Sequence, residues 1–475
     1  MAKVAFIQSF WLEKLGIMHI SSMLKRHGHQ TCMAIYDKKS IRKKLLAFKP
    51  DIVGFQCTTG MQGWVYEMAR FVKEEIDKKI LVLVGGAHPT YFPEMIDREH
   101  IDLICRGEGE YPTLELVRRL DAKRDFTDIE NLWVKREGKI YQNPMRPLIE
   151  DLDGLPFPDR ELYEDYKFIH AAPYKHSITS RGCAYNCTFC YNHTYRNMHK
   201  AGGKYVRRRS IDNIIEDLQE QKRKSNLETV LFLDDNFNLV SRDWFFSFLD
   251  RYKRKIDLPF FCSVRADSLD DEMVKRIKEA GCYWIEMGLE AGNERYRNEV
   301  LKKNLKDEDL LRAGSLLRRY KISFDTTNMI GLPNETVEDA IYGLKLNARI
   351  KPDVAWYSIF QPYPKTELGE YCLSEGLVER LDRDSVKAQF HTTSPLNQSN
   401  IKELENLHKF AHVAAKMPFL LPLIRLLIKL PPNPLFLYFQ RFTYLIFYHT
   451  KYNRINLRRT VEETLVALKY YRDKG

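Results

Sequence analysis

Short apolar runs alternate with amphipathic stretches along the first 120 residues of the chain. Residues 3–9 read as a buried strand, and residues 16–27 carry apolar side chains at helical spacing and end before Gly28. The same alternation continues with strands at 31–36, 52–57 and 80–84, a short strand ending near Cys105, and helices at 40–48 and 62–77. Strands that alternate with helices predict a doubly wound parallel sheet, which binds ligands at the carboxyl ends of its strands.

The pattern changes over residues 121–170. Residues 131–134 and 139–141 predict a small hairpin around Glu137-Gly138, and four prolines then interrupt regular structure. We therefore predict a first domain over 1–120 and a linker over 121–170.

From residue 176 the alternation of strands and helices resumes. Strands are predicted at 176–179, 229–233, 260–265, 283–288, 323–330 and 355–360, and a helix at 210–224 has Ser210 as its N-cap. Six such repeats predict a partial (β/α)6 barrel over 171–390, with its chemistry at the carboxyl ends of the strands. A helix at 400–415 opens a helical C-terminal region, 391–475.

Three cysteines stand out in a loop after the first of these strands. Cys183, Cys187 and Cys190 follow C-x3-C-x2-C spacing, so three thiolates on one loop could hold three irons of a [4Fe–4S] cube and leave the fourth open. With His193 three positions further on, the same loop could instead form a Cys3His zinc site.

The cysteine content and the first residues of the chain bear on the cellular compartment. Nine cysteines in 475 residues are too sparse for a disulfide scaffold, and Met1-Ala2-Lys3 leads straight into a strand rather than a signal peptide, so we expect a reducing, cytoplasmic protein. The net charge of +11 is compatible with an anionic partner, but no compact Arg-rich motif points to nucleic acid.

Several motifs at predicted strand ends favour the iron–sulfur cluster over the zinc site. Together with the cysteine spacing, they resemble the motifs of the radical S-adenosylmethionine (radical SAM) superfamily. These strand-end motifs are Asp234-Asp235-Asn236, Gly288-Leu289-Glu290-Ala291-Gly292 and the turns 331–336 and 361–366. Residues 1–120 resemble the cobalamin-binding domain that precedes many of its members, on the segments 85–90 and 106–110. In the turns, Asn334 and Lys365 replace expected glycines, and because Lys rarely adopts a left-handed backbone, the second turn is expected to differ in shape.

The resemblance implies a set of cofactor contacts. Asp234, Asp235 and Asn236 would meet the SAM ammonium, Arg265 its carboxylate, and Glu290 its ribose or methionine part. The alternatives are a helix cap or surface turn for 234–236 and a structural ion pair for Arg265. The implied cobalamin contacts are Ser9, Thr58, Thr59, Gly85, Gly86, His88 and Glu108.

The first domain departs from the D-x-H-x-x-G loop of other cobalamin proteins. Trp11 and Glu13 stand where that loop, aligned on Gly16, has Asp and His, so no histidine should ligate cobalt from below. The alternative is a degenerate nucleotide-type domain that binds nothing.

The resemblance implies an enzyme with a [4Fe–4S] cluster, SAM and cobalamin that methylates an unactivated carbon of a small-molecule or lipid-like substrate. One electron from a donor such as flavodoxin or ferredoxin would split SAM into methionine and a 5′-deoxyadenosyl radical, which takes hydrogen from the substrate, and cobalamin would carry the methyl group. The alternatives are a cobalamin-containing radical cyclase or rearrangement enzyme, and a metal-binding regulatory protein with a sensor domain.

Residues 417–448 are unusually apolar and aromatic. Pro418, Pro422 and Pro431 interrupt them, and Arg425 and Lys429 lie among them, so we do not predict a transmembrane helix here. One interpretation is a helical subdomain that buries these side chains. The other is a segment that lies on the inner membrane surface, making the protein a peripheral membrane enzyme.

Overall fold

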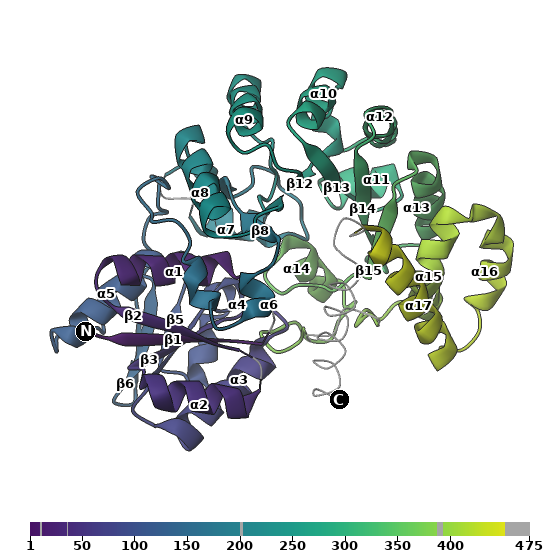
Figure 1. Cartoon of the computed structure of the whole chain (residues 1–475). Coiled ribbons are helices and arrows are strands. Elements are labelled where there is room, and N and C mark those ends of the chain that lie inside the picture. The colour runs from purple at the N-terminus through teal and green to yellow at the C-terminus, as the bar shows by residue number, and fades with distance from the viewer. Residues whose placement is uncertain (10–11, 36, 200–202, 387–392, 452–475) are drawn as a thin grey trace. The chain divides into compact units, whose positions relative to one another are not determined.

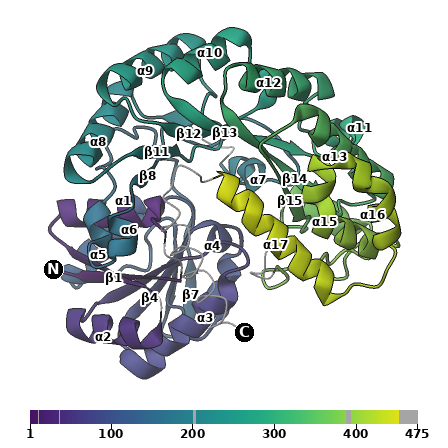
Figure 2. The same ribbon diagram turned by 45° about the vertical axis from the view of Figure 1, so that its right-hand side comes forward.

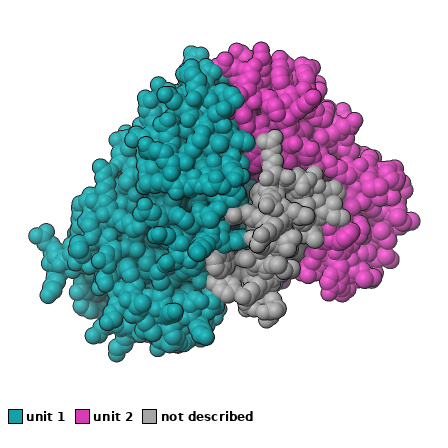
Figure 3. Space-filling view, in the orientation of Figure 1, with its two compact units in different colours: residues 1–260, 362–370, 380–389 teal, residues 261–361, 371–379, 390–475 magenta. Residues whose placement is uncertain are grey.

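The computed structural model describes residues 1–9, 12–35, 37–199, 203–386 and 393–451 (Figure 1). The chain divides into two compact units, coloured in Figure 3. The first contains Met1–Phe260, Pro362–Glu370 and Arg380–Gln389, and the second contains Phe261–Gln361, Tyr371–Glu379 and Phe390–Gly475.

The first unit is built on a seven-stranded sheet in the order β2-β1-β3-β4-β5-β6-β7. Its strands are β1 (Lys3–Gln8), β2 (Gln30–Ile35), β3 (Ile52–Gln56), β4 (Leu81–Gly85), β5 (Leu103–Cys105), β6 (Leu132–Arg136) and β7 (Lys139–Gln142). The first five are parallel, as predicted. The predicted hairpin forms β6 and β7, which continue the sheet antiparallel from β5, so the sheet extends into the stretch that the sequence assigned to the linker.

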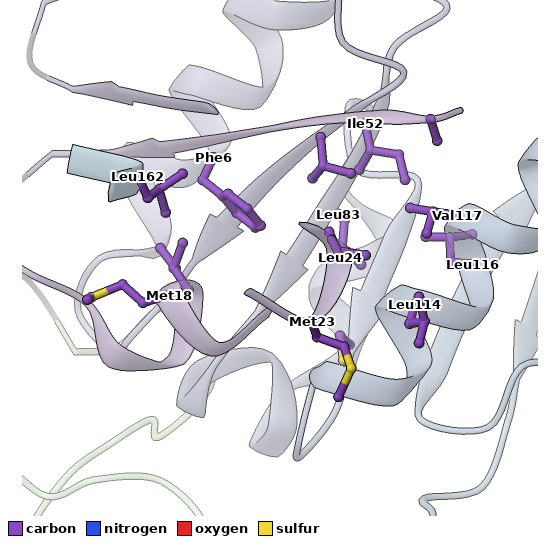
Figure 4. Packing of buried hydrophobic residues seen from close by; sticks show 14 of the residues in the cluster. Phe6, Met18, Met23, Leu24, Ile52, Leu83, Leu114, Leu116, Val117 and Leu162 are labelled. Atoms are coloured by element: carbon purple, nitrogen blue, oxygen red, sulfur yellow. The ribbon is translucent and has the colours of Figure 1, made fainter. Parts of the chain in front are cut away.

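Helices cover both faces of this sheet. They are α1 (Leu15–Arg26), α2 (Lys38–Phe48), α3 (Gln62–Phe71), α4 (Ala87–Tyr91) and α5 (Glu110–Asp121), with a π-helical turn at Val72–Ile76 and a 3-10 turn at Pro93–Asp97. Figure 4 shows Phe6, Ile52 and Leu83 of the strands packing with side chains of α1 and α5. Ala5, Ile7 and Val53 pack in a second core, because neighbouring strand residues point to opposite faces.

The rest of the first unit carries the cysteine loop. Its elements are a 3-10 turn (Arg160–Tyr163), α6 (Lys167–His170), β8 (Tyr174–Ser177), β9 (Ser180–Arg181), α7 (Tyr191–Met198), β10 (Arg207–Arg208), α8 (Ile211–Lys224), β11 (Thr229–Phe232) and α9 (Arg242–Lys255). β8 and β11 are parallel neighbours. Ser210 caps α8, as predicted, because its side chain accepts a hydrogen bond from the Asn213 N–H.

The second unit continues the alternation (Figure 2). It contains β12 (Phe260–Val264, which starts at the last residue of the first unit's main segment), a 3-10 turn (Ala266–Ser268), α10 (Asp271–Glu279), β13 (Cys282–Glu290), α11 (Glu294–Glu299), α12 (Asp307–Arg319), β14 (Ser323–Ile330), α13 (Val337–Ile350) and β15 (Val354–Ile359). β13, β14 and β15 are parallel. All six strands predicted for this half of the chain are present.

The described C-terminal part is helical, as predicted. After α14 (Glu367–Ser374) come α15 (Ile401–Lys416), a 3-10 turn (Pro418–Leu420), α16 (Leu421–Leu427) and α17 (Pro434–Lys451). No helix within the described residues has the length and apolar character needed to cross a membrane. The predicted fold class is confirmed: a parallel α/β domain, a second α/β region and C-terminal helices.

Candidate functional site

The cysteine loop lies between β9 and α7. The Cys190 N–H donates to the Cys187 carbonyl (3.1 Å), which turns the loop into α7. Gly182, just before Cys183, has φ +91°, and a Cβ there would lie 2.6 Å from the Tyr205 carbonyl oxygen. A side chain cannot fit at that distance, so this loop path requires glycine.

The three loop thiols are half-buried and form no disulfide. Burial raises the pKa of Cys190 to about 11, the Asn192 N–H opposes this, and nearby Cys187, Asp235 and Cys183 add to the rise. An unliganded Cys190 is therefore protonated at neutral pH, whereas bound iron would hold it as thiolate. Three soft thiolate donors on one loop are the kind of ligand set that an iron–sulfur cluster takes.

Two further observations concern the metal ligands. No three Cys, His, Asp or Glu side chains of the described ranges gather where one metal ion could sit. His193, the fourth residue of the zinc interpretation, has its Nδ1 3.8 Å from Oε2 of Glu367. The roles of Cys183, Cys187 and Cys190 as cluster ligands remain predictions from their spacing.

Asp234, just after β11, holds the start of the cysteine loop. Its buried carboxylate accepts hydrogen bonds from the N–H and hydroxyl of Thr179 and from the hydroxyl of Ser180. Burial raises the pKa of Asp234, while the Ser180 and Thr179 donors and the Arg208 charge lower it. This carboxylate is therefore occupied by the chain itself, which fits a residue that positions the loop better than a direct SAM contact.

Asp235 and Asn236 remain suited to a ligand. Asp235 is exposed, its carboxylate accepts from the Asn192 amide (2.8 Å), and desolvation by the surrounding chain raises its pKa. Asn236 is buried, and its side-chain oxygen has no hydrogen-bond partner among the described residues. The Ser177 hydroxyl at the end of β8 is likewise buried and unpartnered there. Buried polar atoms without partners are rare, and a bound SAM ammonium would satisfy such oxygens.

Glu108 and Glu110 form a buried ion network with two arginines of the cysteine region. Glu108 accepts from Arg181 (2.7 Å) and Arg207 (2.9 Å), and Glu110 accepts from Arg181 (2.6 Å). Burial alone would raise the pKa of Glu110, but the Arg181 charge lowers it overall. Glu108 also accepts from the Ile149 N–H (2.7 Å). The loop after β5 is thus tied to the residue that precedes Gly182-Cys183.

The other residues predicted to contact cobalamin lie at the ends of β1, β3 and β4. Ser9 is buried, Thr58 is exposed, and Gly85 is half-buried. Gly86 has φ +102°, and a Cβ there would lie 2.9 Å from the Cys57 carbonyl oxygen, so packing against the end of β3 requires this glycine. No observation shows these residues contacting a ligand, and their role remains a prediction.

His88 is fully buried in α4. Its Nδ1 lies 3.4 Å from the Thr59 hydroxyl, its Nε2 has no partner among the described residues, and its ring contacts Phe92. Burial lowers the pKa of His88 to about 4, so the ring is neutral at pH 7.

Sequence reasoning missed a group of five tyrosines beside the cysteine loop. Tyr91 of α4 stacks on Tyr191, which follows Cys190, with 4.1 Å between ring centroids. Tyr363 packs against Tyr191, and Tyr195 packs edge-on against Tyr91 and Tyr205. The signal was present in the spacing of Tyr191 and Tyr195, which places both on one side of a helix directly after the last cysteine.

Two predicted SAM contacts lie in the second unit. Arg265 pairs with Asp267 (2.9 Å) and donates to the Lys303 carbonyl (2.7 Å), which matches its alternative interpretation as a structural ion pair. Glu290 accepts from Lys303 Nζ (3.2 Å) and has φ +72°. This conformation is unfavourable for Glu, and such strain often occurs at functional sites, so Glu290 remains a candidate.

Both glycine-replacing turn residues adopt the left-handed backbone. Asn334 has φ +59° and Lys365 has φ +65°, so Lys365 adopts the conformation that a lysine was expected to avoid. The Lys365 ammonium donates to the Tyr91 carbonyl and lies 4.8 Å from the centre of the Phe92 ring. These contacts offset the cost of the left-handed lysine, which sequence alone could not show.

Glu335 of the 331–336 turn is expected to make the stability of the folded chain depend on pH. Burial raises its pKa to about 8 from 4.5, partly opposed by the N–H groups of Leu332 and Gly331. Because the folded chain keeps a proton that the unfolded chain releases, the stability from this proton is full below pH 4.5 and is lost as the pH rises to 8. We expect the free energy of unfolding to fall over this window by at most about 1.4 kcal/mol per pH unit.

Glu335→Gln should flatten this dependence, since its amide keeps the acceptor oxygen and cannot ionise. Denaturant unfolding at several pH values measures the effect, with exposed Glu308→Gln as the control. If the free energy of unfolding of Glu335→Gln depends on pH as that of wild type does, the buried carboxyl does not titrate in this range.

Two families match this chain. Residues 10–117 match the B12 binding domain, and residues 177–343 match the radical SAM superfamily. An uncharacterized methyltransferase of Pyrococcus horikoshii is 30% identical over 374 residues, which cover 77% of this chain and 79% of the relative. An anaerobic magnesium-protoporphyrin IX monomethyl ester cyclase of Rubrivivax gelatinosus is 24% identical and covers 74% of this chain and 65% of its own.

The fold also resembles a solved structure. The radical S-adenosylmethionine methyltransferase TsrM of Kitasatospora setae, bound to tryptophan and a SAM analogue, covers 80% of this chain and 78% of its own. The TM-score is 0.66 at 17% identity, a likeness that establishes the shared fold.

Proposed function

The chain belongs to the cobalamin-dependent radical SAM enzymes, and we propose that it methylates an unactivated carbon of a small-molecule or lipid-like substrate. The observation that carries the proposal is that a B12-binding domain and a radical SAM domain occur in one chain whose relatives include a methyltransferase. The regulatory alternative is set aside because these relatives are enzymes.

Each group of residues has a distinct task in this proposal. Cys183, Cys187 and Cys190 hold the cluster, and Asn236 and Asp235 orient the SAM ammonium. The Glu108–Arg181 pair would fix the start of the loop that carries the three cysteines. When bound, the cluster and SAM supply the radical that removes a substrate hydrogen, and cobalamin supplies the methyl group. The protein holds the reactants in place and keeps water away from them.

Electrons and substrate come from partners that we infer by chemistry. Cluster reduction needs a one-electron donor such as flavodoxin or ferredoxin. The substrate is small or lipid-like, and a lipid-like one would suit an enzyme at the inner membrane face.

A second candidate function is radical cyclisation or rearrangement, favoured by the similarity to the Rubrivivax cyclase. Both functions consume SAM as a radical source, but only methyl transfer also uses SAM as a methyl donor. Incubation with SAM carrying a deuterated methyl group distinguishes them: a labelled product supports methyl transfer, and an unlabelled, rearranged product supports the alternative.

The cobalamin-binding assignment predicts cobalt without a protein ligand below the ring. Glu13 replaces the ligand histidine and accepts from Lys175 (3.1 Å) and Arg160 (3.0 Å), and His88 is enclosed in the protein. The electron paramagnetic resonance spectrum of the cob(II)alamin form should lack nitrogen splitting from a histidine, and His88→Ala should not change it. Nitrogen splitting that disappears in His88→Ala would refute the prediction.

A further inference from the structure

The second unit exposes an apolar stripe along its outermost helix. Four apolar side chains recur at helical spacing from the 3-10 turn, along α16, to just past the end of that helix. They are Phe419, Leu423, Leu426 and Leu430. Their exposed fractions are 71%, 53%, 67% and 48%. Figures 1 and 2 both place α16 at the outer edge of the unit, beyond α15. We call this set of four side chains the α16 stripe.

The opposite face of the same helix is buried. Leu421, Ile424 and Ile428 pack into the apolar cluster that contains Leu407 and Ala411 of α15. α16 is therefore apolar on both faces, and only one of them has a place in the core. A surface helix normally presents polar residues to water, and contiguous exposed apolar side chains mark an interaction surface.

The charged residues of the segment that carries the stripe are all basic. Residues 417–451 contain Arg425, Lys429, Arg441 and Lys451 and no Asp or Glu. Lys429 is exposed, next to Leu430. Arg425 extends from the same helix to Glu338 of α13. Apolar side chains bordered by cations are typical of segments that lie in the interface of an anionic membrane.

We propose that the α16 stripe docks on an anionic lipid bilayer, with its four apolar side chains among the acyl chains and Lys429 at the lipid headgroups. A second copy of the chain fits less well, because two-fold pairing through this segment would bring together two copies of residues 417–451, which contain basic residues and no Asp or Glu. The inference deepens the proposed function, since docking would deliver a lipid-like substrate, but it is measured without catalysis and can fail independently.

Vesicle co-sedimentation tests the proposal on the full chain. Phosphatidylcholine vesicles with phosphatidylglycerol should carry the protein down at low salt, and pure phosphatidylcholine should carry much less. The variant Leu423→Glu, Leu426→Glu should lower the bound fraction on the order of tenfold, because two charges would enter the interface. Leu46→Glu, which changes an exposed leucine of α2, is the matched control and should bind like wild type.

Measurements of folding and of oligomeric state complete the test. The substitutions lie at exposed positions, so circular dichroism and light scattering should show the variant folded and in the same oligomeric state as wild type. Wild-type protein that stays in the supernatant with anionic vesicles at low salt would overturn the proposal. A wild-type dimer that the double variant dissociates would overturn it too, because the stripe would then be a self-interface.

Discussion

Replacing Cys187 with Ala is expected to remove the four-iron cluster and, with it, all radical cleavage of SAM. In this account each of the three cysteines would supply one cluster ligand, and two thiolates would not hold the cube in place of three. Cys187 is half-buried on a loop, so the chain should still fold. Iron and sulfide content of the anaerobically purified protein, together with 5′-deoxyadenosine formation, measure the loss. Cys183→Ala and Cys190→Ala should behave alike.

Two control variants distinguish an iron–sulfur cluster from a zinc ion in the loop. Cys32→Ala changes a buried cysteine of β2 and should keep full iron content. His193→Ala should also keep the cluster, because the imidazole is not expected to be a ligand. Colourless protein that holds one zinc per chain and loses it in His193→Ala would refute the radical SAM interpretation of the loop.

The second large effect is expected from Arg181→Met. Removing this guanidinium leaves the buried Glu110 carboxylate without its partner and weakens the hold on Glu108. An uncompensated buried charge costs about 3–5 kcal/mol of stability. Because Arg181 immediately precedes Gly182-Cys183, we also expect incomplete cluster assembly in the variant that does fold.

A surface ion pair provides the matched control for this variant. Arg136 pairs with Asp125 at 3.0 Å, and both side chains are exposed, so Arg136→Met should cost at most about 1 kcal/mol. Adding Glu110→Gln to Arg181→Met should recover part of the lost stability, because the unpaired charge is removed. Thermal unfolding compares the four chains. An Arg181→Met variant as stable as Arg136→Met would contradict a structural role for the network.

The fold was largely predictable because its hydrophobic pattern is regular. Every strand predicted in the parallel sheet and in the second α/β region is present, and the Ser210 cap follows from local chemistry. The pairing of the β6–β7 hairpin with β5 was not predictable, since local pattern gives a hairpin but not its neighbour. α7 was also missed, because most of its residues are polar and none of them is fully buried.

The hydrogen-bond partners of the site residues could not be predicted from the sequence. Spacing identifies Asp234 and Glu108 as polar groups at strand ends, but only the fold shows which donors they meet. Asp234 is bound by Thr179 and Ser180, and Glu108 by Arg181 and Arg207. The α16 stripe is a similar case, because an apolar segment does not reveal which of its faces is buried. Leu421 is in the core, whereas Leu423 is exposed.

The products of SAM test the central claim most directly. Anaerobic protein loaded with iron, sulfide and cobalamin is reduced, given SAM, and analysed by mass spectrometry, with Cys187→Ala as the control. We predict that wild type forms both 5′-deoxyadenosine and S-adenosylhomocysteine, one from radical cleavage and one from methyl donation, and that Cys187→Ala forms no 5′-deoxyadenosine. Loaded and reduced wild type that forms neither product would contradict the claim.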